Sequence, residues 1–167
     1  MVGMTPNATN HTGLPPQASR FVEVEGLPWE PTRFPGIETK TLFLDKDTGS
    51  VTALIKMAPG AKLPDHEHPL SEQSFVLEGV LEDDDGSCTA GNFVWRPAGS
   101  RHQAWSEGGC VVLGIFQVPN RFFENGGRIA DVLGQDWEAA WGHAGNLRRP
   151  ADRPRRLPGR ASAIGAI

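Results

Sequence analysis

Apolar and polar residues alternate along much of the chain, most clearly at residues 37–44 and 51–57. In the second of these runs Thr52 and Lys56 fall on the side opposite the apolar residues. A period of two residues predicts half-buried β-strands. The same pattern predicts further strands at residues 21–23, 75–79, 80–83, 88–95 and 111–118.

Turn-forming residues separate the predicted strands. Glycine and proline supply the unusual or preset φ values that tight turns need, and the run from Asp83 to Gly86 is typical of a hairpin tip. The other turn sequences are Asp47-Thr48-Gly49, Pro59-Gly60, Pro97-Ala98-Gly99 and Gly108-Gly109. Short strands without intervening helices predict an all-β sandwich or barrel.

One segment has a helical pattern, and both ends of the chain are poor in core-forming residues. Apolar positions between residues 129 and 141 fall at helical spacing, which predicts a short C-terminal helix against the barrel. Residues 1–19 are polar and rich in turn formers, so we expect a flexible N-terminal arm. We therefore expect one domain at residues 20–146 and a basic Pro/Arg-rich tail at residues 147–167.

Charge is unevenly distributed along the chain. Six arginines and one aspartate give residues 147–167 a net charge of +5, so residues 1–146 carry −9 of the total of −4. An acidic body repels phosphate backbones, and the basic tail lacks aromatic residues that could stack on bases. We therefore expect no nucleic-acid partner.

No segment is long and apolar enough to span a bilayer, and the N-terminus does not have the pattern of a secretion signal. These features predict a cytoplasmic protein without a membrane partner. Cys88 and Cys110 lack metal-type spacing, and in a reducing compartment we expect both to be free thiols.

Three of the five histidines lie in two compact patterns that predict a metal site. The first pattern is Gly60-x5-His66-x-His68-x3-Glu72-x6-Gly79. If the segment is extended, His66 and His68 project from the same face of a strand. Pro69 helps the chain to turn, so that the Glu72 carboxylate can approach the same point.

The second pattern, Gly91-x5-Pro97-x-Gly99-x2-His102, brings a third imidazole from another strand. Three histidines and one carboxylate suit Fe²⁺, Mn²⁺, Zn²⁺, Ni²⁺ or Cu²⁺ and suit Ca²⁺ or Mg²⁺ poorly. We therefore predict one divalent transition metal, preferably Fe²⁺, held by His66, His68, Glu72 and His102. In the alternative arrangement Glu72 does not bind the metal and orients an imidazole.

These two patterns match the motifs of the cupin (RmlC-like) superfamily, and this resemblance covers residues 60–106. It implies a double-stranded β-helix, or jelly-roll barrel, and by analogy a homodimer. Val76-Leu77-Glu78-Gly79, the hairpin at residues 82–86 and the segment from Pro97 to Cys110 resemble the cupin domain of the zinc anti-sigma factors.

Two later segments resemble acetylacetone-cleaving, non-haem iron dioxygenases. They are residues 118–123, Val-Pro-Asn-Arg-Phe-Phe, and residues 134–141. Those enzymes use three histidines without a glutamate ligand, whereas this chain has Glu72 at the glutamate spacing.

The favoured function is therefore an Fe²⁺ oxygenase acting on a small diketone or hydroxyketone. A zinc-binding regulatory or ligand-sensing cupin without turnover is the alternative, and a metal-dependent isomerase, epimerase or lyase would share the same fold and ligands. A substrate-sized apolar cavity beside the metal would favour an enzyme. No catalytic residue is assigned, since strand parity does not show which of Gln73, Trp95, Arg96, Arg101 and Trp105 point inward.

Overall fold

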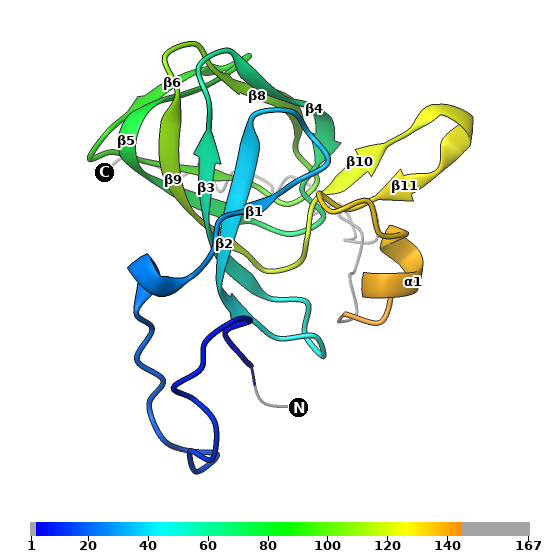
Figure 1. The fold of residues 1–167 in the computed structure, drawn as a ribbon. Helices are drawn as coiled ribbons and strands as arrows, with labels where there is room; N and C mark the ends of the chain where they lie inside the picture. The colour runs from blue at the N-terminus through cyan, green and yellow to red at the C-terminus, as the bar shows by residue number, and fades with distance from the viewer. Residues whose placement is uncertain (1–2, 145–167) are drawn as a thin grey trace, which may run out of the picture.

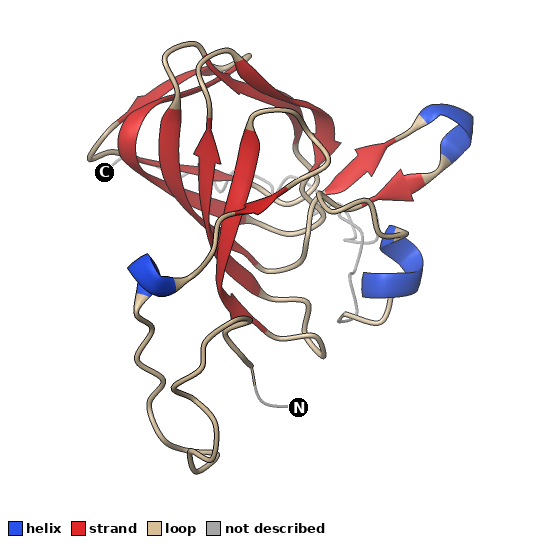
Figure 2. Ribbon diagram, viewed as in Figure 1, coloured by secondary structure: helices blue, strands red, loops and turns tan. Residues whose placement is uncertain are grey.

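The computed structural model describes residues 3–144, which consist mainly of β-strands curled into a barrel (Figures 1 and 2). The strands are β1 (Glu30–Pro31), β2 (Ile37–Leu44), β3 (Val51–Met57), β4 (Ala61–Glu67), β5 (Glu72–Asp83), β6 (Gly86–Thr89), β7 (Phe93–Arg96), β8 (Arg101–Ser106), β9 (Cys110–Phe116), β10 (Arg121–Phe123) and β11 (Ile129–Ala130). The helical elements are η1 (Val24–Gly26), η2 (Asn125–Gly127) and α1 (Trp137–Trp141). The predicted all-β class is confirmed.

The sequence correctly locates the ends of the two strands for which it gives the clearest alternation of apolar and polar residues. β2 and β3 have the predicted bounds, whereas β5 joins two predicted strands into one, with a register shift between Val76 and Glu78. The predicted strand at residues 88–95 is wrong in one respect, because Gly91 has φ +81° and a turn there separates β6 from β7. The predicted strand at residues 21–23 is wrong, since that segment forms no strand.

Strand pairing brings distant parts of the chain together. The sheet order is β1-β2-β3-β9-β5-β8-β4-β10-β11, with β6 and β7 also paired to β5. The curling of this sheet places β4 and β8 beside each other, and the β10–β11 hairpin projects from that side of the barrel (Figure 1). The two histidine motifs, on β4 and β8, therefore meet on adjacent strands.

Two apolar clusters hold the fold together. The barrel core consists of Ile37, Met57, Ala61, Val76, Leu81, Ala104, Cys110 and Val112. A second cluster beneath α1 consists of Val118, Trp137, Trp141 and Ala144. Burial of apolar side chains contributes about 1.5–3 kcal/mol for each large residue, so the clusters fix the barrel and dock the C-terminal segment onto it.

The C-terminal helix is shorter than the predicted range of residues 129–141. Ile129 and Ala130 form strand β11, and Asp131 then makes a turn by accepting hydrogen bonds from the backbone N–H groups of Leu133 and Gln135. The carboxylate of Asp136 caps α1 by accepting from the Ala139 N–H at 2.9 Å. An aspartate turn and an N-cap compete with helix formation, so the helix begins only at Trp137.

The N-terminal segment contacts the barrel at one place. Met4 and Leu44 exchange backbone hydrogen bonds of 2.8 and 2.7 Å, and the Thr5 hydroxyl donates to the Leu42 carbonyl at 2.7 Å. The predicted basic tail at residues 147–167 lies outside the described residues. Cys88 and Cys110 are free thiols, as predicted. Within residues 3–144 there is no helix of the length and apolar character that crossing a bilayer requires.

Candidate metal centre

The antiparallel pairing of β4 with β8 sets two of the three histidines face to face. His66 and His102 are direct register partners, and partners in an antiparallel ladder point to the same face of the sheet. A register irregularity between Leu63 and His66 turns the end of β4 toward the barrel interior. His66 is consequently 2% exposed.

His68 joins the same face just beyond the end of β4. Its backbone N–H donates to the Ser100 carbonyl at 2.9 Å, and its own carbonyl accepts from the Gly99 N–H at 2.7 Å. Gly99 has φ +83°, a left-handed conformation that glycine adopts without strain. The turn before His102 therefore also anchors His68, which is fully buried.

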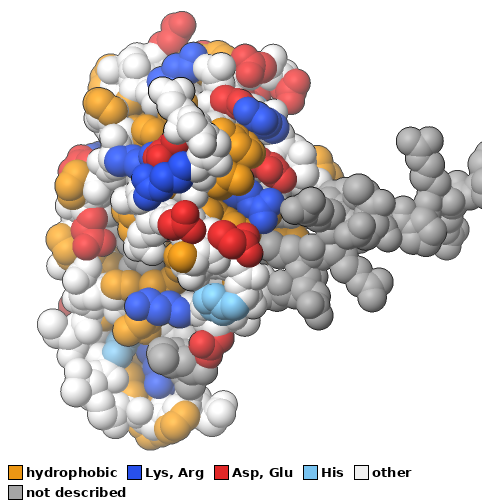
Figure 3. Space-filling view, turned by 90° about the vertical axis from the view of Figure 1, so that its right-hand side faces the viewer, with side chains coloured by type: hydrophobic (Ala, Val, Ile, Leu, Met, Phe, Trp, Pro, Cys, Tyr) orange, Lys and Arg blue, Asp and Glu red, His pale blue; other side chains and the backbone are white. Residues whose placement is uncertain are grey.

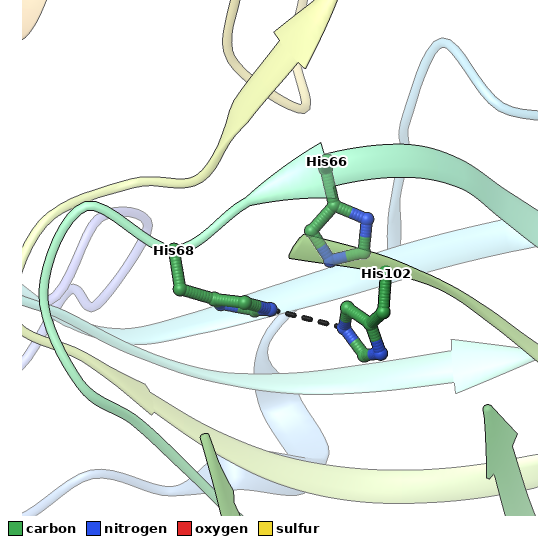
Figure 4. Close-up of side chains that lie close together, drawn as sticks. All are labelled: His66, His68 and His102. Carbon is green, nitrogen blue, oxygen red and sulfur yellow. Dashed lines mark hydrogen bonds between the residues drawn. The ribbon is translucent and has the colours of Figure 1, made fainter. Parts of the chain in front are cut away.

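The three imidazoles converge on one point (Figure 4). One potential ligand atom from each histidine lies within 4.8 Å of the other two. The ring centroid of His66 lies 4.9 Å from the ring centroid of His68 and 4.7 Å from that of His102. Nε2 of His68 lies 3.0 Å from Nε2 of His102. Donor atoms this close can bind a single ion.

Each histidine has an oxygen atom close to its Nδ1. Nδ1 of His66 lies 2.8 Å from the Pro64 carbonyl and Nδ1 of His102 lies 3.2 Å from Asp83 Oδ2, both in hydrogen-bond geometry. Nδ1 of His68 lies 2.9 Å from Glu72 Oε2, but this contact does not have hydrogen-bond geometry. An acceptor at Nδ1 places the ring proton there and leaves the lone pair on Nε2. For His66 and His102 this leaves Nε2 free to bind a metal. Nε2 of His68 lies within hydrogen-bond distance of Nε2 of His102, and the buried Nδ1 of His68 has no hydrogen-bond partner among the described residues. Converging, incompletely satisfied ring nitrogens in a buried cluster fit a metal ion.

Burial favours the neutral, metal-binding form of His66 and His102. It lowers the pKa of His66 to about 4, and burial together with the nearby Arg96 guanidinium also lowers the pKa of His102. Metal binding requires a deprotonated imidazole nitrogen. Both rings are thus ready to bind metal at neutral pH, where an ordinary exposed histidine is still partly protonated.

Glu72 lies in the same site, but its oxygens contact several other polar groups. Oε1 accepts hydrogen bonds from the Ser74 hydroxyl at 3.0 Å and from Arg96 at 3.2 Å. Oε2 accepts from the Asn120 amide at 3.1 Å and lies beside Nδ1 of His68. Burial raises the pKa of Glu72, but His68 and Arg96 together outweigh this and hold it well below its usual range. Glu72 is therefore ionised, and its place beside Nδ1 of His68 fits the arrangement in which it orients that ring. Direct binding of Glu72 to the metal stays a prediction.

Arg96 links the groups behind two of the histidines. One guanidinium nitrogen lies 3.2 Å from Glu72 and another lies 2.6 Å from Asp83, while the arginine side chain is only 8% exposed. The carboxyl pKa of Asp83 is raised by burial but lowered further by the Arg96 hydrogen bond, and the net shift is downward. A single buried cation thus connects the carboxylates that contact His68 and His102.

Exposure and strand register show which of the other residues near the motifs point toward the site and which point outward. Trp95 is 61% exposed and so points outward, and the exposed Arg101 pairs with Asp65. Register partners share a face, so Gln73, paired with Trp95, points outward as well. The Trp105 ring lies beneath the Lys62 ammonium. Of the flanking residues considered from the sequence, Arg96 is therefore the one that contacts the site.

Sequence reasoning missed Asp83 and Asn120. Asp83 lies in an acidic run that is typical of a solvated hairpin tip, and its distance from His102 along the chain gives no indication of contact. Asn120 follows β9 and reaches Glu72 from 48 positions away in sequence. Only the curling of β5 and of the segment after β9 brings these side chains to the histidines.

Two adjacent cavities adjoin the cluster. The inner cavity, about 40 Å³, is lined by His66, Glu72 and His102 among others. The outer cavity, about 480 Å³, has mainly apolar walls. They share four lining residues, Ile55, Leu63, Phe116 and Asn120. The ring of Phe122, which also lines the outer cavity, stacks on His66 at a centroid distance of 4.9 Å.

The face that carries the β10–β11 hairpin is mixed in charge. Acidic and basic side chains alternate over this face, with hydrophobic side chains between them (Figure 3). Several of these charges form pairs, including Arg33 and Arg128 with Glu124 and Arg121 with Glu67. Exposed pairs of this kind contribute about 0–1 kcal/mol each, so they shape the surface more than they stabilise it.

A curled jelly-roll barrel with a histidine cluster on its inner face defines a cupin, as the sequence motifs predict. The family model for the ChrR cupin-like domain matches residues 17–117, more than half of the chain, so the protein belongs to this family. A search of curated proteins finds no match.

Several solved structures are similar to this chain. A candidate acetylacetone dioxygenase from Methylibium petroleiphilum is 22% identical, with 77% of this chain and 95% of that chain covered and a TM-score of 0.63. An acetylacetone dioxygenase from Acinetobacter johnsonii is 20% identical, with coverages of 77% and 94% and a TM-score of 0.61. The anti-sigma factor ChrR of Rhodobacter sphaeroides, in complex with SigE, is 23% identical, with coverages of 56% and 51% and a TM-score of 0.49.

Proposed function

We propose that this cupin is a non-haem Fe²⁺ oxygenase acting on a small diketone or hydroxyketone. The observation that carries the proposal is the outer cavity of about 480 Å³, which shares walls with the cavity of the histidine cluster. Its volume lies within the range of about 300–1,000 Å³ typical of small-molecule sites. A zinc ion with a purely structural role needs no such cavity.

Different residues of the site would bind the metal and surround the substrate. His66, His68 and His102 would hold the ion, and the acceptors at Nδ1 of His66 and His102 fix the orientations of those two rings. A bound Fe²⁺ would supply Lewis acidity toward the ketone oxygens and electron transfer to O₂. The apolar walls, among them Phe116 and Phe122, exclude water from the ketone and strengthen the electrostatic interactions within the site.

The test combines metal analysis with an oxygen assay. Protein purified without oxygen is analysed for bound metals, loaded with Fe²⁺ and assayed in an oxygen electrode with a panel of β-diketones and hydroxyketones. We expect substrate-dependent oxygen uptake that is absent from Zn²⁺-loaded protein. Tightly held zinc and no uptake with any member of the panel would contradict the oxygenase.

The second candidate is a zinc-binding regulatory or ligand-sensing cupin. Membership of the ChrR cupin-like family supports it, as does the resemblance of residues 76–110 to zinc anti-sigma factors. In that function the same three histidines hold Zn²⁺, and a ligand in the outer cavity changes the conformation without turnover. The assay above separates the two, because a sensor binds ligand and consumes no oxygen.

We also propose a homodimer that forms through the outer face of the β5, β7 and β9 strands. Phe75 and Phe93 are register partners, and Trp95 and Ile115 are both paired with Gln73, so these residues share that face. They are 40–61% exposed. A contiguous apolar patch of this kind is typical of homodimer interfaces. We expect Trp95→Asp to convert a dimer into a monomer in sedimentation analysis, whereas Phe21→Asp, a change at an exposed aromatic residue elsewhere, leaves it dimeric. An unchanged dimer in the Trp95 variant would contradict this interface.

A further inference from the structure

The outer cavity is larger than a small diketone requires and is built from three separated parts of the chain. Strands β2 and β3 form its floor, with Thr41 and Ala53 as register partners. Met4 and Pro6 close one side, and the turn at residues 131–135, together with Trp141, closes another. The shared residues Leu63, Phe116 and Asn120 connect it to the histidine cluster.

Hydrogen bonds hold two walls of the outer cavity in place: the N-terminal wall of Met4 and Pro6, and the C-terminal wall of residues 131–135 and Trp141. The N-terminal wall is tied to β2 by the reciprocal Met4–Leu44 hydrogen bonds. In the C-terminal wall, the buried Asp131 carboxylate accepts from two backbone N–H groups of its own turn and from the Trp141 indole at 2.9 Å. All these polar groups are satisfied within the protein, so they present little demand for a polar ligand. The walls form a compartment beyond the metal site whose surface is mainly apolar, with Thr39, Thr41, Lys46 and Gln135 among its polar lining residues.

We infer that the ligand of this protein has two parts. One is a head with two oxygen atoms that chelate the metal, and the other is an extended apolar tail that occupies the outer cavity. The inference rests on the proposed function only for the chelating head. A head bound at the histidines occupies the end near Phe122, and the apolar space between β2, β3 and the two added walls then holds the tail. Each buried methylene should raise affinity about fourfold, and a buried phenyl group about 10- to 100-fold.

The test compares ligands that share one head and differ in the tail. Acetylacetone and benzoylacetone chelate through the same enolate, so their affinities for Zn²⁺-loaded protein are measured by calorimetry at one pH and divided by their affinities for free Zn²⁺. We expect benzoylacetone to bind at least tenfold more tightly after this correction. Equal corrected affinities would overturn the inference.

Paired variants locate the tail. Thr41→Phe fills the outer cavity and should remove the benzoylacetone advantage while changing acetylacetone affinity less than about twofold. Thr52→Phe, on the neighbouring strand, is the matched control, because Thr52 is paired with the outward Ile115 and does not line the cavity. If Thr41→Phe does not fold, Leu133→Asp serves instead, since Leu133 lies at the cavity edge and is 55% exposed. An advantage retained in the cavity variant would overturn the assignment.

These results are independent of turnover. A tail advantage without oxygen uptake in the iron-loaded protein would contradict the oxygenase and leave the ligand inference standing. Oxygen uptake with acetylacetone, combined with equal corrected affinities, would contradict the tail and leave the oxygenase standing.

Discussion

His66→Ala and His102→Ala are expected to lower the affinity of the protein for a divalent transition metal by roughly a thousandfold or more. Zinc sites in small domains contribute about 10–16 kcal/mol of binding free energy, so the loss of one of three or four ligands removes several kcal/mol. Affinity is measured by competition with a chromophoric chelator, and metal content by elemental analysis. Circular dichroism reports whether the barrel remains folded, which we expect because both apolar clusters stay intact.

His143→Ala is the matched control. This exposed histidine contacts the Lys46 carbonyl at 2.9 Å and lies outside the cluster, so its loss should leave metal content unchanged. Stoichiometric metal retained in both cluster variants would show that the site assignment is wrong.

Glu72→Gln separates the two arrangements of the glutamate. If Glu72 is a fourth ligand, the variant should lose affinity about as strongly as the histidine variants do. If Glu72 orients His68, the glutamine oxygen can still accept from Nδ1, and the loss should be about 10- to 100-fold.

The histidine cluster was predictable from sequence because its geometry follows from local rules. Residues two apart on a strand share a face, which places His66 and His68 together, and the spacing from Gly91 through Gly99 to His102 marks a turn that returns a third ligand. Strand β3 was equally predictable, because its apolar residues recur with a period of two on one buried or half-buried face. The bounds of β2 were also predicted correctly, although its burial pattern is less regular.

The remaining features depend on contacts that no local pattern encodes. The outer cavity is lined by residues near positions 4 and 131, which are far apart in the sequence. The acceptor beside Nδ1 of His102 lies on a hairpin whose acidic sequence is typical of a solvent-exposed turn. The predicted helix from residue 129 failed because Asp131 and Asp136 satisfy backbone N–H groups with their side chains, which the apolar spacing does not reveal.

Arg96 has the second large expected effect, as a positioning residue for two metal ligands at once. Arg96→Met should lower metal affinity about 10- to 100-fold, because Glu72 and Asp83 would lose the cation that fixes them against His68 and His102. It should also destabilise the fold by about 3–5 kcal/mol, since the buried Glu72 carboxylate and the half-buried Asp83 carboxylate are left without their partner. Arg101→Met is the control, because that exposed arginine pairs with Asp65 outside the site.

The two effects of Arg96→Met have different readouts. Thermal unfolding measures the stability, whereas chelator competition and the visible spectrum of Co²⁺-loaded protein report the arrangement of the histidine ligands. Arg96→Lys provides a graded comparison: a lysine ammonium can pair with one carboxylate but does not span two with a planar guanidinium, so metal affinity should recover only in part. A destabilised Arg96→Met protein with unchanged metal affinity and an unchanged Co²⁺ spectrum would reduce Arg96 to a structural role. A shifted spectrum would instead show that the guanidinium sets the geometry of the metal site through the two carboxylates.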